Sequence, residues 1–260
     1  MTTLPCSLVL DDRLGLLDEV ASAIATTLDR TVDRGESGRR KGQYVLDIQA
    51  DDAALAVLRR AGVGVLSEES GLERADADLL VVMDPVDGST NASRGLPWFA
   101  TSLCMYDADG PATALVVNQA SGVRFWAERG RGAWCDGQRL QPTGCTEVAA
   151  AIVGLNGTPA SPYGSAQSRM LGAAALDLCM VAAGVLDAYV DCVHEAHGVW
   201  DYAAASLICI EAGAVVSDAF GRDLFHRDHS ARRTPVAAAT SLLHASLVAA
   251  RNHVTPDQPA

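Results

Sequence analysis

The sequence lacks any long apolar stretch that is free of charged residues. Its longest apolar region, 172–190, is interrupted by Asp177 and Asp187, so we expect no transmembrane helix. The start of the chain, MTTLPCSLVLDDR, has neither the basic segment nor the long apolar core of a signal peptide. Internal repeats and low-complexity tracts are also missing. These absences disfavour membrane, secreted and repeat proteins.

Paired cysteines are missing as well. The seven cysteines are scattered, odd in number and without a C-x-x-C pair, which disfavours a disulfide framework and a structural zinc site. Reduced thiols are the simplest interpretation, and they predict a cytoplasmic protein.

Basic residues are outnumbered by acidic ones, which gives a net charge of −12. Nonspecific binding to nucleic acid or to an anionic membrane needs basic patches, so we expect neither partner. The charge is compatible with a site that concentrates carboxylates around cations. The hydrophobic fraction of 49% fits a globular chain of one or two domains.

The most informative stretch is 79–91, LLVVMDPVDGSTN. Its first five residues form an apolar run of strand length, and Pro85 is expected to end that strand because it lacks a backbone donor. The Asp87-Gly88 pair signals a turn, and the Ser-Thr-Asn run at 89–91 is typical of a helix N-cap. The pattern predicts a strand, a sharp acidic turn and a helix start.

Two carboxylates in this stretch, Asp84 and Asp87, create an electrostatic conflict. Backbone N–H groups at a helix start attract phosphate, whereas neighbouring acids repel it unless a cation lies between them. This conflict predicts a divalent metal that bridges carboxylates and phosphate. An ordinary acidic turn is the alternative for the Asp-x-x-Asp pair taken alone.

Two other places supply acids at the boundary of an expected element. Glu68 and Glu69 follow directly after a short apolar strand at 63–66, and acids at a strand end can point into a ligand crevice. Asp201 follows Trp200 at the start of an alanine-rich helix, where a carboxylate would also simply complement the helix dipole.

Together, these motifs resemble the signature of the inositol monophosphatase family. DPVDGSTN is similar to the family's DPxDGTTN, and it is accompanied by an upstream Ser67-Glu68-Glu69-Ser70 motif and a downstream Trp200-Asp201 motif. The resemblance covers most of the chain and implies an α+β fold, the layered αβαβα sandwich shared with fructose-1,6-bisphosphatase. It also implies a homodimer and a Mg²⁺-dependent, lithium-sensitive phosphatase that hydrolyses a small phosphate monoester.

The resemblance assigns a role to each motif residue. It implies two or three Mg²⁺ ions, whose ligands would be Glu68, Asp84, the Val86 carbonyl, Asp87 and Asp201. Asp84 would bridge two ions, while the attacking water would be oriented by Glu68, Ser89 and Asp51. The substrate-binding groups would be Asp87, Gly88, Ser89, Thr90 and Asp201, with the N–H groups of 88–90 on the phosphate.

The acid of the third metal is open between three candidates. The family has a V-T-x-x-D motif here, and Asp51 is our choice for its aspartate, although Ile48 replaces the threonine. Asp47 and Asp52 compete with it, and helix capping is the alternative role for all of them.

A charged loop at 34–43 precedes these acids. In the resembled family this region is mobile, and a lysine in it helps to bind metal or substrate. Lys41 is the candidate for that role, and a plain solvated loop is the alternative.

The substrate is not fixed by these motifs. Inositol-specific members carry a glutamate seven residues before the motif aspartate, where this chain has His194, and Ala173 replaces a serine that contacts substrate in some members. Another phosphosugar, histidinol phosphate or adenosine 3′,5′-bisphosphate are therefore alternatives, as is a non-catalytic metal-binding regulatory protein. His194 and His197 are three apart, but the other proposed ligands are all oxygen, so zinc is not expected.

The chain is expected to comprise two halves. Residues 1–145 would hold the first metal-binding motifs and an antiparallel meander between 100 and 140, whose breaks are turn-like. Residues 146–260 would form an α/β half that contributes Asp201. The two halves together are expected to make one compact catalytic unit.

Overall fold

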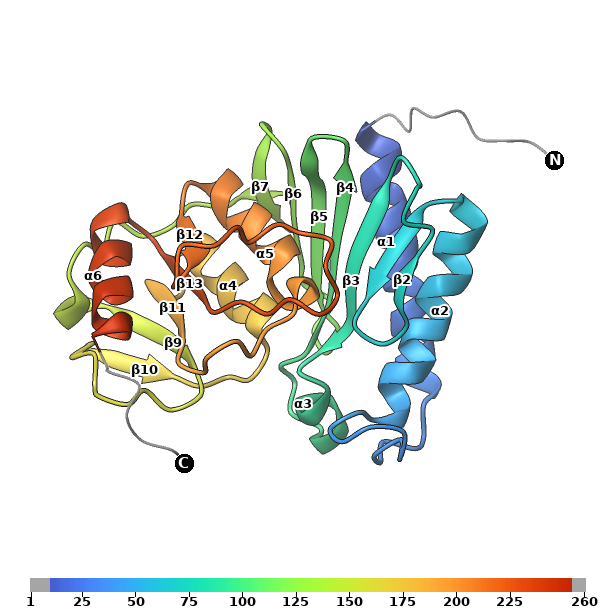
Figure 1. Cartoon of the computed structure of the whole chain (residues 1–260), viewed down its shortest axis with the longest axis horizontal. Coiled ribbons are helices and arrows are strands. Elements are labelled where there is room, and N and C mark those ends of the chain that lie inside the picture. Colours follow the sequence, from blue (N-terminus) through green and yellow to red (C-terminus); the bar gives the residue numbers. More distant parts are fainter. Residues whose placement is uncertain (1–9, 254–260) are drawn as a thin grey trace.

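The computed structural model describes residues 10–253, and its helices and sheets alternate in layers (Figure 1). Along the long axis, a helix pair is followed by a large sheet, a second helix pair, a small sheet and a final helix. The αβαβα sandwich expected from the sequence is therefore confirmed.

The helices follow the apolar periodicity of the sequence. Their bounds are α1 Leu10–Arg30, α2 Val45–Ala61, α3 Ser89–Arg94, α4 Ala174–Ala182, α5 Val199–Ala212 and α6 Ser241–Asn252, with a 3₁₀ turn at Val148–Ala150. In α1, Leu17, Val20 and Ile24 recur at helical spacing and are fully buried. Gly62 ends α2 because it adopts the left-handed conformation, with φ of 76°.

The large sheet holds the first two acidic motifs. Its strands are β1 Gly64–Ser67, β2 Gly71–Glu73, β3 Leu80–Asp87, β4 Ala100–Asp107, β5 Gly110–Asn118, β6 Arg124–Glu128, β7 Gly132–Cys135 and β8 Gln138–Arg139. They lie in the order β2-β1-β3-β4-β5-β6-β7-β8. The pair β1–β3 is parallel and the strands from β3 to β8 are antiparallel, which confirms the expected meander.

The small sheet belongs to the second half of the chain. Its strands are β9 Ile152–Asn156, β10 Gln167–Arg169, β11 Ala188–Asp191, β12 Val215–Asp218 and β13 Pro235–Ala238, in the order β10-β9-β11-β13-β12. The sequence did not predict β10, because its three residues are all polar and exposed. The edge strand forms only by pairing with β9.

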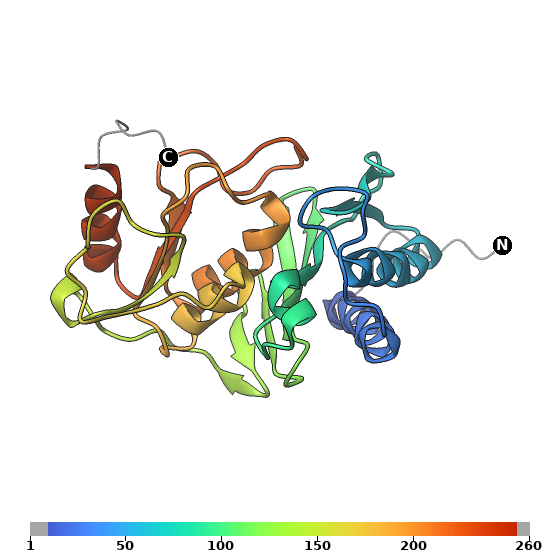
Figure 2. The same ribbon diagram turned by 90° about the horizontal axis from the view of Figure 1, so that it is seen from below.

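The central helices α4 and α5 lie between the two sheets, as the view from below shows (Figure 2). One hydrophobic cluster joins them to both sheets, since it contains Val82 and Val116 from the large sheet and Tyr189 and Ala237 from the small one. The alanines at 203–205 are fully buried, and their small side chains allow close approach on every side. A helix from the second half therefore packs directly on the strands that carry the first acids.

The strand before the acidic turn is longer than the sequence predicted. We expected Pro85 to end it, but β3 continues to Asp87, and the register with β4 shifts between Asp84 and Asp87. A proline is tolerated at such a bulge because no ladder hydrogen bond is required of it. The helix cap also differs: Gly88, with φ of 84°, is the N-cap of α3, and the side chains at 89–91 do not cap the helix.

Membrane-spanning helices were not expected. Among residues 10–253, none of the helices is both long and apolar enough to cross a bilayer.

Candidate active site

Three carboxylates from distant parts of the chain converge at one end of the central helix layer. Glu68 follows β1, Asp84 lies in β3 and Asp201 lies in the first turn of α5. One ligand oxygen from each lies within 4.8 Å of the other two. The acids that three separate motifs predicted therefore form a single centre.

The backbone explains why the three acids meet. Parallel pairing of β1 with β3 places Glu68 beside the acidic turn, and the Glu68 N–H donates to the Met83 carbonyl over 3.2 Å. The Ser102 hydroxyl on β4 donates to the Trp200 carbonyl over 3.0 Å. That bond ties the start of α5 to the large sheet, so Asp201 is held opposite Asp84.

Burial and neighbouring negative charges raise the pKa values of two carboxyl groups in this centre. Burial, together with the charges of Asp201 and Glu69, raises the pKa of Glu68 to about 8. Burial and the charge of Glu68 raise the pKa of Asp84 well above its usual range. Carboxylates held this close favour either a proton or a cation among them.

Asp87 lies near the centre and also contacts the start of α4. Its Oδ1 accepts the Ala174 N–H over 3.2 Å and its Oδ2 accepts the Ala175 N–H over 2.7 Å, at the start of α4. Burial and the charge of Asp201 raise the pKa of Asp87 to about 8. Asp87 thus joins the acidic turn to α4, and it stands outside the group of three converging carboxylates.

The acidic turn itself is rigid. The Val86 N–H donates to Asp84 Oδ1 over 2.9 Å, and the Thr101 hydroxyl donates to the Pro85 carbonyl over 2.8 Å. Val86 is buried beside the carboxylates. The metal-binding role of its carbonyl stays a prediction.

Gly88 cannot be replaced by a larger residue in this turn. Its φ of 84° is left-handed, and a Cβ there would lie 3.0 Å from the Gly172 carbonyl and 3.1 Å from the Ala173 Cβ. The next residues, Ser89 and Thr90, begin α3. Their N–H groups are the predicted phosphate donors.

The three candidates for the acid of the third metal differ in their burial and in their hydrogen bonds. Asp47 is buried, and its Oδ2 accepts the Tyr44 N–H over 2.8 Å, while its buried Oδ1 lies near Ser89 and has no partner within hydrogen-bonding geometry among residues 10–253. Burial raises the pKa of Asp47 to about 7, and the Asp47 charge in turn contributes to the raised pKa values of Glu68 and Asp84.

Asp51, our choice from the sequence, lies one helical turn further along α2. Its Oδ1 accepts the hydroxyl of Ser67, and burial raises its pKa. Asp52 is exposed. Asp47 and Asp51 are thus both buried, whereas Asp52 is not, and the choice of Asp51 stays a prediction.

A basic residue that we had not singled out contacts the centre. Arg40 Nη2 lies 2.7 Å from Glu69 and 3.3 Å from Glu68, whereas exposed Lys41, our candidate, makes no ion pair among residues 10–253. Both are in the charged loop, and the metal- or substrate-binding role of Lys41 stays a prediction. The run of basic residues at 39–41 was the available signal.

A histidine that the sequence left without a role orients Asp201. His197 Nδ1 lies 3.2 Å from Asp201 Oδ2, and the Gly198 N–H donates to the same oxygen over 2.8 Å. On its other side, His197 Nε2 lies 3.1 Å from Asn156 Nδ2 and 3.2 Å from the Tyr189 hydroxyl. Burial opposes its charged form, but Asp201 and Asp191 raise the pKa of His197 to about 9. Asp201 Oδ1 is left for a ligand.

His194, by contrast, is a rim residue. Its ring is exposed and packs at a tilt against Phe220, with 5.0 Å between ring centroids and 53° between ring planes. The two histidines three residues apart therefore do not form a zinc pair.

The donor set fits a hard divalent cation. Glu68, Asp84 and Asp201 offer only oxygen, and the unpartnered Oδ1 of Asp47 adds another oxygen nearby. Carboxylate oxygens with room for waters are the environment that Mg²⁺ prefers. Thiolate and imidazole ligands, which favour zinc or copper, are not part of the group.

The layered α+β sandwich and its oxygen-rich acidic centre define a phosphatase of the metal-dependent class. More particularly, the chain belongs to the inositol monophosphatase family, whose model matches residues 13–255. The family, fold and phosphatase class expected from the sequence are therefore confirmed.

Individual relatives match this chain over most of its length. The fructose-1,6-bisphosphatase/inositol-1-monophosphatase of Archaeoglobus fulgidus is 32% identical over 238 residues, which cover 88% of this chain and 92% of the relative. Nus factor SuhB of Pasteurella multocida is 31% identical over 223 residues, covering 77% and 81%. The solved structure of an extragenic suppressor from Pyrococcus furiosus gives a TM-score of 0.81 at 27% identity, covering 92% of this chain and 100% of the other.

Proposed function

We propose that this protein is a Mg²⁺-dependent phosphatase that hydrolyses a small phosphorylated metabolite. The convergence of Glu68, Asp84 and Asp201 within 4.8 Å is the observation that carries the proposal. Three carboxylates held this close have no structural benefit in an apolar layer, and a cation would resolve their repulsion.

The residues that would hold two Mg²⁺ ions are Glu68, Asp84, the Val86 carbonyl, Asp87 and Asp201. A third ion would use Asp51 or Asp47, and the buried Oδ1 of Asp47 has no partner within hydrogen-bonding geometry among residues 10–253. When bound, Mg²⁺ supplies a water of lowered pKa and charge stabilisation for the leaving alkoxide. His197 would hold Asp201 in the orientation that leaves Oδ1 free, as ligand-orienting groups do in other metal centres.

The residues of the acidic turn and of α3 would position the phosphate. The N–H groups of Gly88, Ser89 and Thr90 would bind its oxygens, because they are free donors at a helix start. Ser89 and Glu68 would orient the attacking water, and Asp51 would keep the Ser67 hydroxyl in place beside them.

Two positions bear on the substrate. His194 stands on the rim where inositol-specific members have glutamate, and Ala173 packs against the turn at Gly88. Neither supplies a carboxylate or hydroxyl to a sugar ring. We infer a phosphosugar phosphatase of broad or different specificity, which is consistent with a relative named for both fructose bisphosphate and inositol phosphate.

We also propose that residues 1–145 and 146–260 work as one catalytic unit, because α5 of the second half brings Asp201 to the sheet of the first. Six cysteines among the described residues are free thiols, which supports a cytoplasmic location. A homodimer is proposed from family membership, and a monomer in solution scattering would contradict it.

A non-catalytic regulatory role is the second candidate, because one relative is named as a Nus factor. The full set of acids argues against it, since a binding protein has no need to retain Glu68, Asp84 and Asp201 in mutual repulsion.

The experiment that separates the two candidates measures phosphate release from a panel of phosphate monoesters. The panel should include inositol, fructose, histidinol and adenosine phosphates, each with Mg²⁺ and with EDTA. We expect Mg²⁺-dependent release from at least one substrate, and none from an Asp84→Asn control. Release from no substrate would favour the regulatory role.

A further inference from the structure

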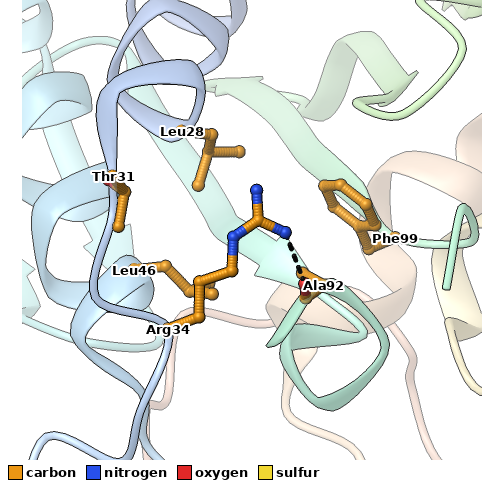
Figure 3. A pocket seen from close by; sticks show the side chains of 6 residues that line it. All are labelled: Leu28, Thr31, Arg34, Leu46, Ala92 and Phe99. Carbon is orange, nitrogen blue, oxygen red and sulfur yellow. Dashed lines mark hydrogen bonds between the residues drawn. The ribbon is translucent and has the colours of Figure 1, made fainter. Parts of the chain in front are cut away.

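We propose that Arg34 is a positioning residue that locks the charged loop before α2 onto helix α3. The Arg34 side chain enters a small cavity between α1, α2 and α3, where its Nη1 donates to the Ala92 carbonyl over 3.1 Å (Figure 3). The inference deepens the proposed function, because α3 carries the predicted phosphate donors.

The cavity is built for this side chain and not for a ligand. It is lined by Leu28, Thr31, Leu46, Ala92 and Phe99 around Arg34 itself. Its volume of about 20 Å³ has room for about one water molecule. Leu46 and Ala92 are buried, at 2% and 3% exposure, so the stem of Arg34 has apolar walls on which to pack.

The acceptor of this hydrogen bond is well suited to a cation. Ala92 lies in the last turn of α3, and its carbonyl also accepts the Gly95 N–H over 3.2 Å. The carbonyl end of a helix is electronegative and attracts positive charge. In a helix of six residues, this contact adds to the two hydrogen bonds by which Asn91 donates to the Trp98 and Leu171 carbonyls.

Backbone contacts connect the two ends of the loop that Arg34 anchors. Glu36 pairs with Tyr44 in an antiparallel bridge, the Val45 N–H donates to the Gly35 carbonyl over 3.0 Å, and the Ser37 N–H donates to the Gln43 carbonyl over 2.8 Å. A displacement at Arg34 is therefore transmitted along residues 35–45.

Other contacts of the loop lie at the acidic centre itself. Arg40 contacts Glu68 and Glu69, and the Tyr44 hydroxyl lies 3.2 Å from Thr90 Oγ1. A cation on Glu68 competes with Arg40, and a phosphate at the start of α3 competes with Tyr44. The contact of Arg34 is at the opposite end of α3, so it holds the loop whether or not the centre is occupied.

The test compares hydrogen exchange of the metal-free protein in three variants. Arg34→Leu keeps the apolar packing and removes the donor, and Arg34→Lys restores a single donor. Arg39→Leu is the matched control, because Arg39 is in the same loop and its side chain makes no hydrogen bond or ion pair within residues 10–253.

We expect backbone exchange in residues 35–45 and 88–96 to become about tenfold faster in Arg34→Leu, as for the loss of one charge-assisted hydrogen bond. Arg34→Lys should recover part of the protection, and Arg39→Leu should match the wild type. Unchanged exchange of both segments in Arg34→Leu would overturn the inference, as would equal acceleration in Arg39→Leu.

Kinetics give a second readout that loss of folding would not mimic. In Arg34→Leu, the KM and the inhibition constant of inorganic phosphate should rise about threefold to tenfold, because α3 is misplaced. The Mg²⁺ concentration for half-saturation should not rise, since α3 carries none of the three converging carboxylates and a loosened loop would only withdraw Arg40, which competes with a cation on Glu68. Weaker Mg²⁺ binding with unchanged KM would contradict the role. If the wild type hydrolyses no monoester, the proposed function fails, and the exchange experiment still decides the role of Arg34.

Discussion

Buried acids in two regions of this protein have pKa values that are shifted in opposite directions. In the second half, Asp218 is almost fully buried, yet its oxygens accept from the Arg222 guanidinium over 2.8 and 3.0 Å and from the Thr234 N–H over 2.9 Å. Burial opposes its charge, but these donors bring the pKa of Asp218 below its usual value. At the acidic centre, Glu68 and Asp84 have raised pKa values.

The difference lies in which partners the fold supplies. Asp218 has an arginine four residues away in the same turn, whereas Asp84 has no ion pair among the described residues. Among residues 10–253, Arg40 of the charged loop contacts Glu68 with a side chain that is 45% exposed, and His197 contacts Asp201. Compensated acids stabilise a fold, and acids left uncompensated form a site for a cation that comes from solution.

The largest effect should follow from removing the central acid. Asp84→Asn is expected to lower kcat by about 1,000-fold or more, because a carboxylate of the proposed cation site is lost. The same change relieves repulsion, so the Tm of the metal-free protein should rise while its increase on adding Mg²⁺ disappears. Calorimetry with and without Mg²⁺, beside steady-state kinetics, measures both. Full activity of Asp84→Asn in excess Mg²⁺ would falsify the bridging role.

A smaller effect is expected from the residue that orients Asp201. His197→Gln should weaken Mg²⁺ affinity by about 10- to 100-fold, the usual effect of losing a group that orients a metal ligand. Isothermal titration of the metal-free protein with Mn²⁺ measures this without turnover. His194→Gln is the matched control, because His194 is exposed and contacts Phe220 instead of Asp201. Equal losses in both variants would exclude a specific role for His197.

The centre should also respond to pH in a defined direction. The pKa values of Glu68 and Asp87 are raised to about 8, so their protonated forms favour the metal-free fold. That stability is present at acidic pH and is lost as the pH rises through about 8. Cation binding must release these protons, and the half-saturating Mg²⁺ concentration should fall at least about tenfold between pH 6.5 and 8.5. A pH-independent Mg²⁺ requirement would contradict the raised values.

The smallest effect on catalysis is expected at the compensated acid. Asp218→Asn should leave kcat within about twofold of the wild type, because Asp218 lies outside the converging group. It should cost about 2 kcal/mol of folding free energy by leaving Arg222 partly unpaired, which lowers Tm by about 4–8 °C. Thermal unfolding and kinetics on the same sample test this. A large loss of kcat at constant Tm would contradict a purely stabilising role for Asp218.

Sequence reasoning found the acids that belong to motifs and missed those whose role depends on orientation. Asp47 and Asp51 are four residues apart and share a face of α2, so their pattern cannot tell which one points at the centre. The choice depends on how far α2 is shifted along the large sheet. The same limit applies to Arg40 and Lys41, since adjacent side chains on a loop diverge and the sequence alone cannot tell which one faces the centre.

Other differences arose from the backbone. Pro85 was expected to end a strand, because it cannot donate a hydrogen bond, but a bulge between Asp84 and Asp87 lets β3 continue past it. Asp87 was expected beside Asp84 as a ligand, a role that stays a prediction, and its oxygens also accept N–H groups of α4, which the sequence did not indicate. The distant helix that supplies these donors could not be placed from local propensity.

The sequence alone determined the family, the layered α+β fold and the three acids Glu68, Asp84 and Asp201, because strand and helix periodicity and short motifs are local properties. The tertiary structure decided which oxygens are free, which histidine holds Asp201 and which arginine anchors the loop on α3. Those outcomes depend on the relative placement of elements far apart in the chain, and that placement is set by packing of the shared helix layer between two sheets.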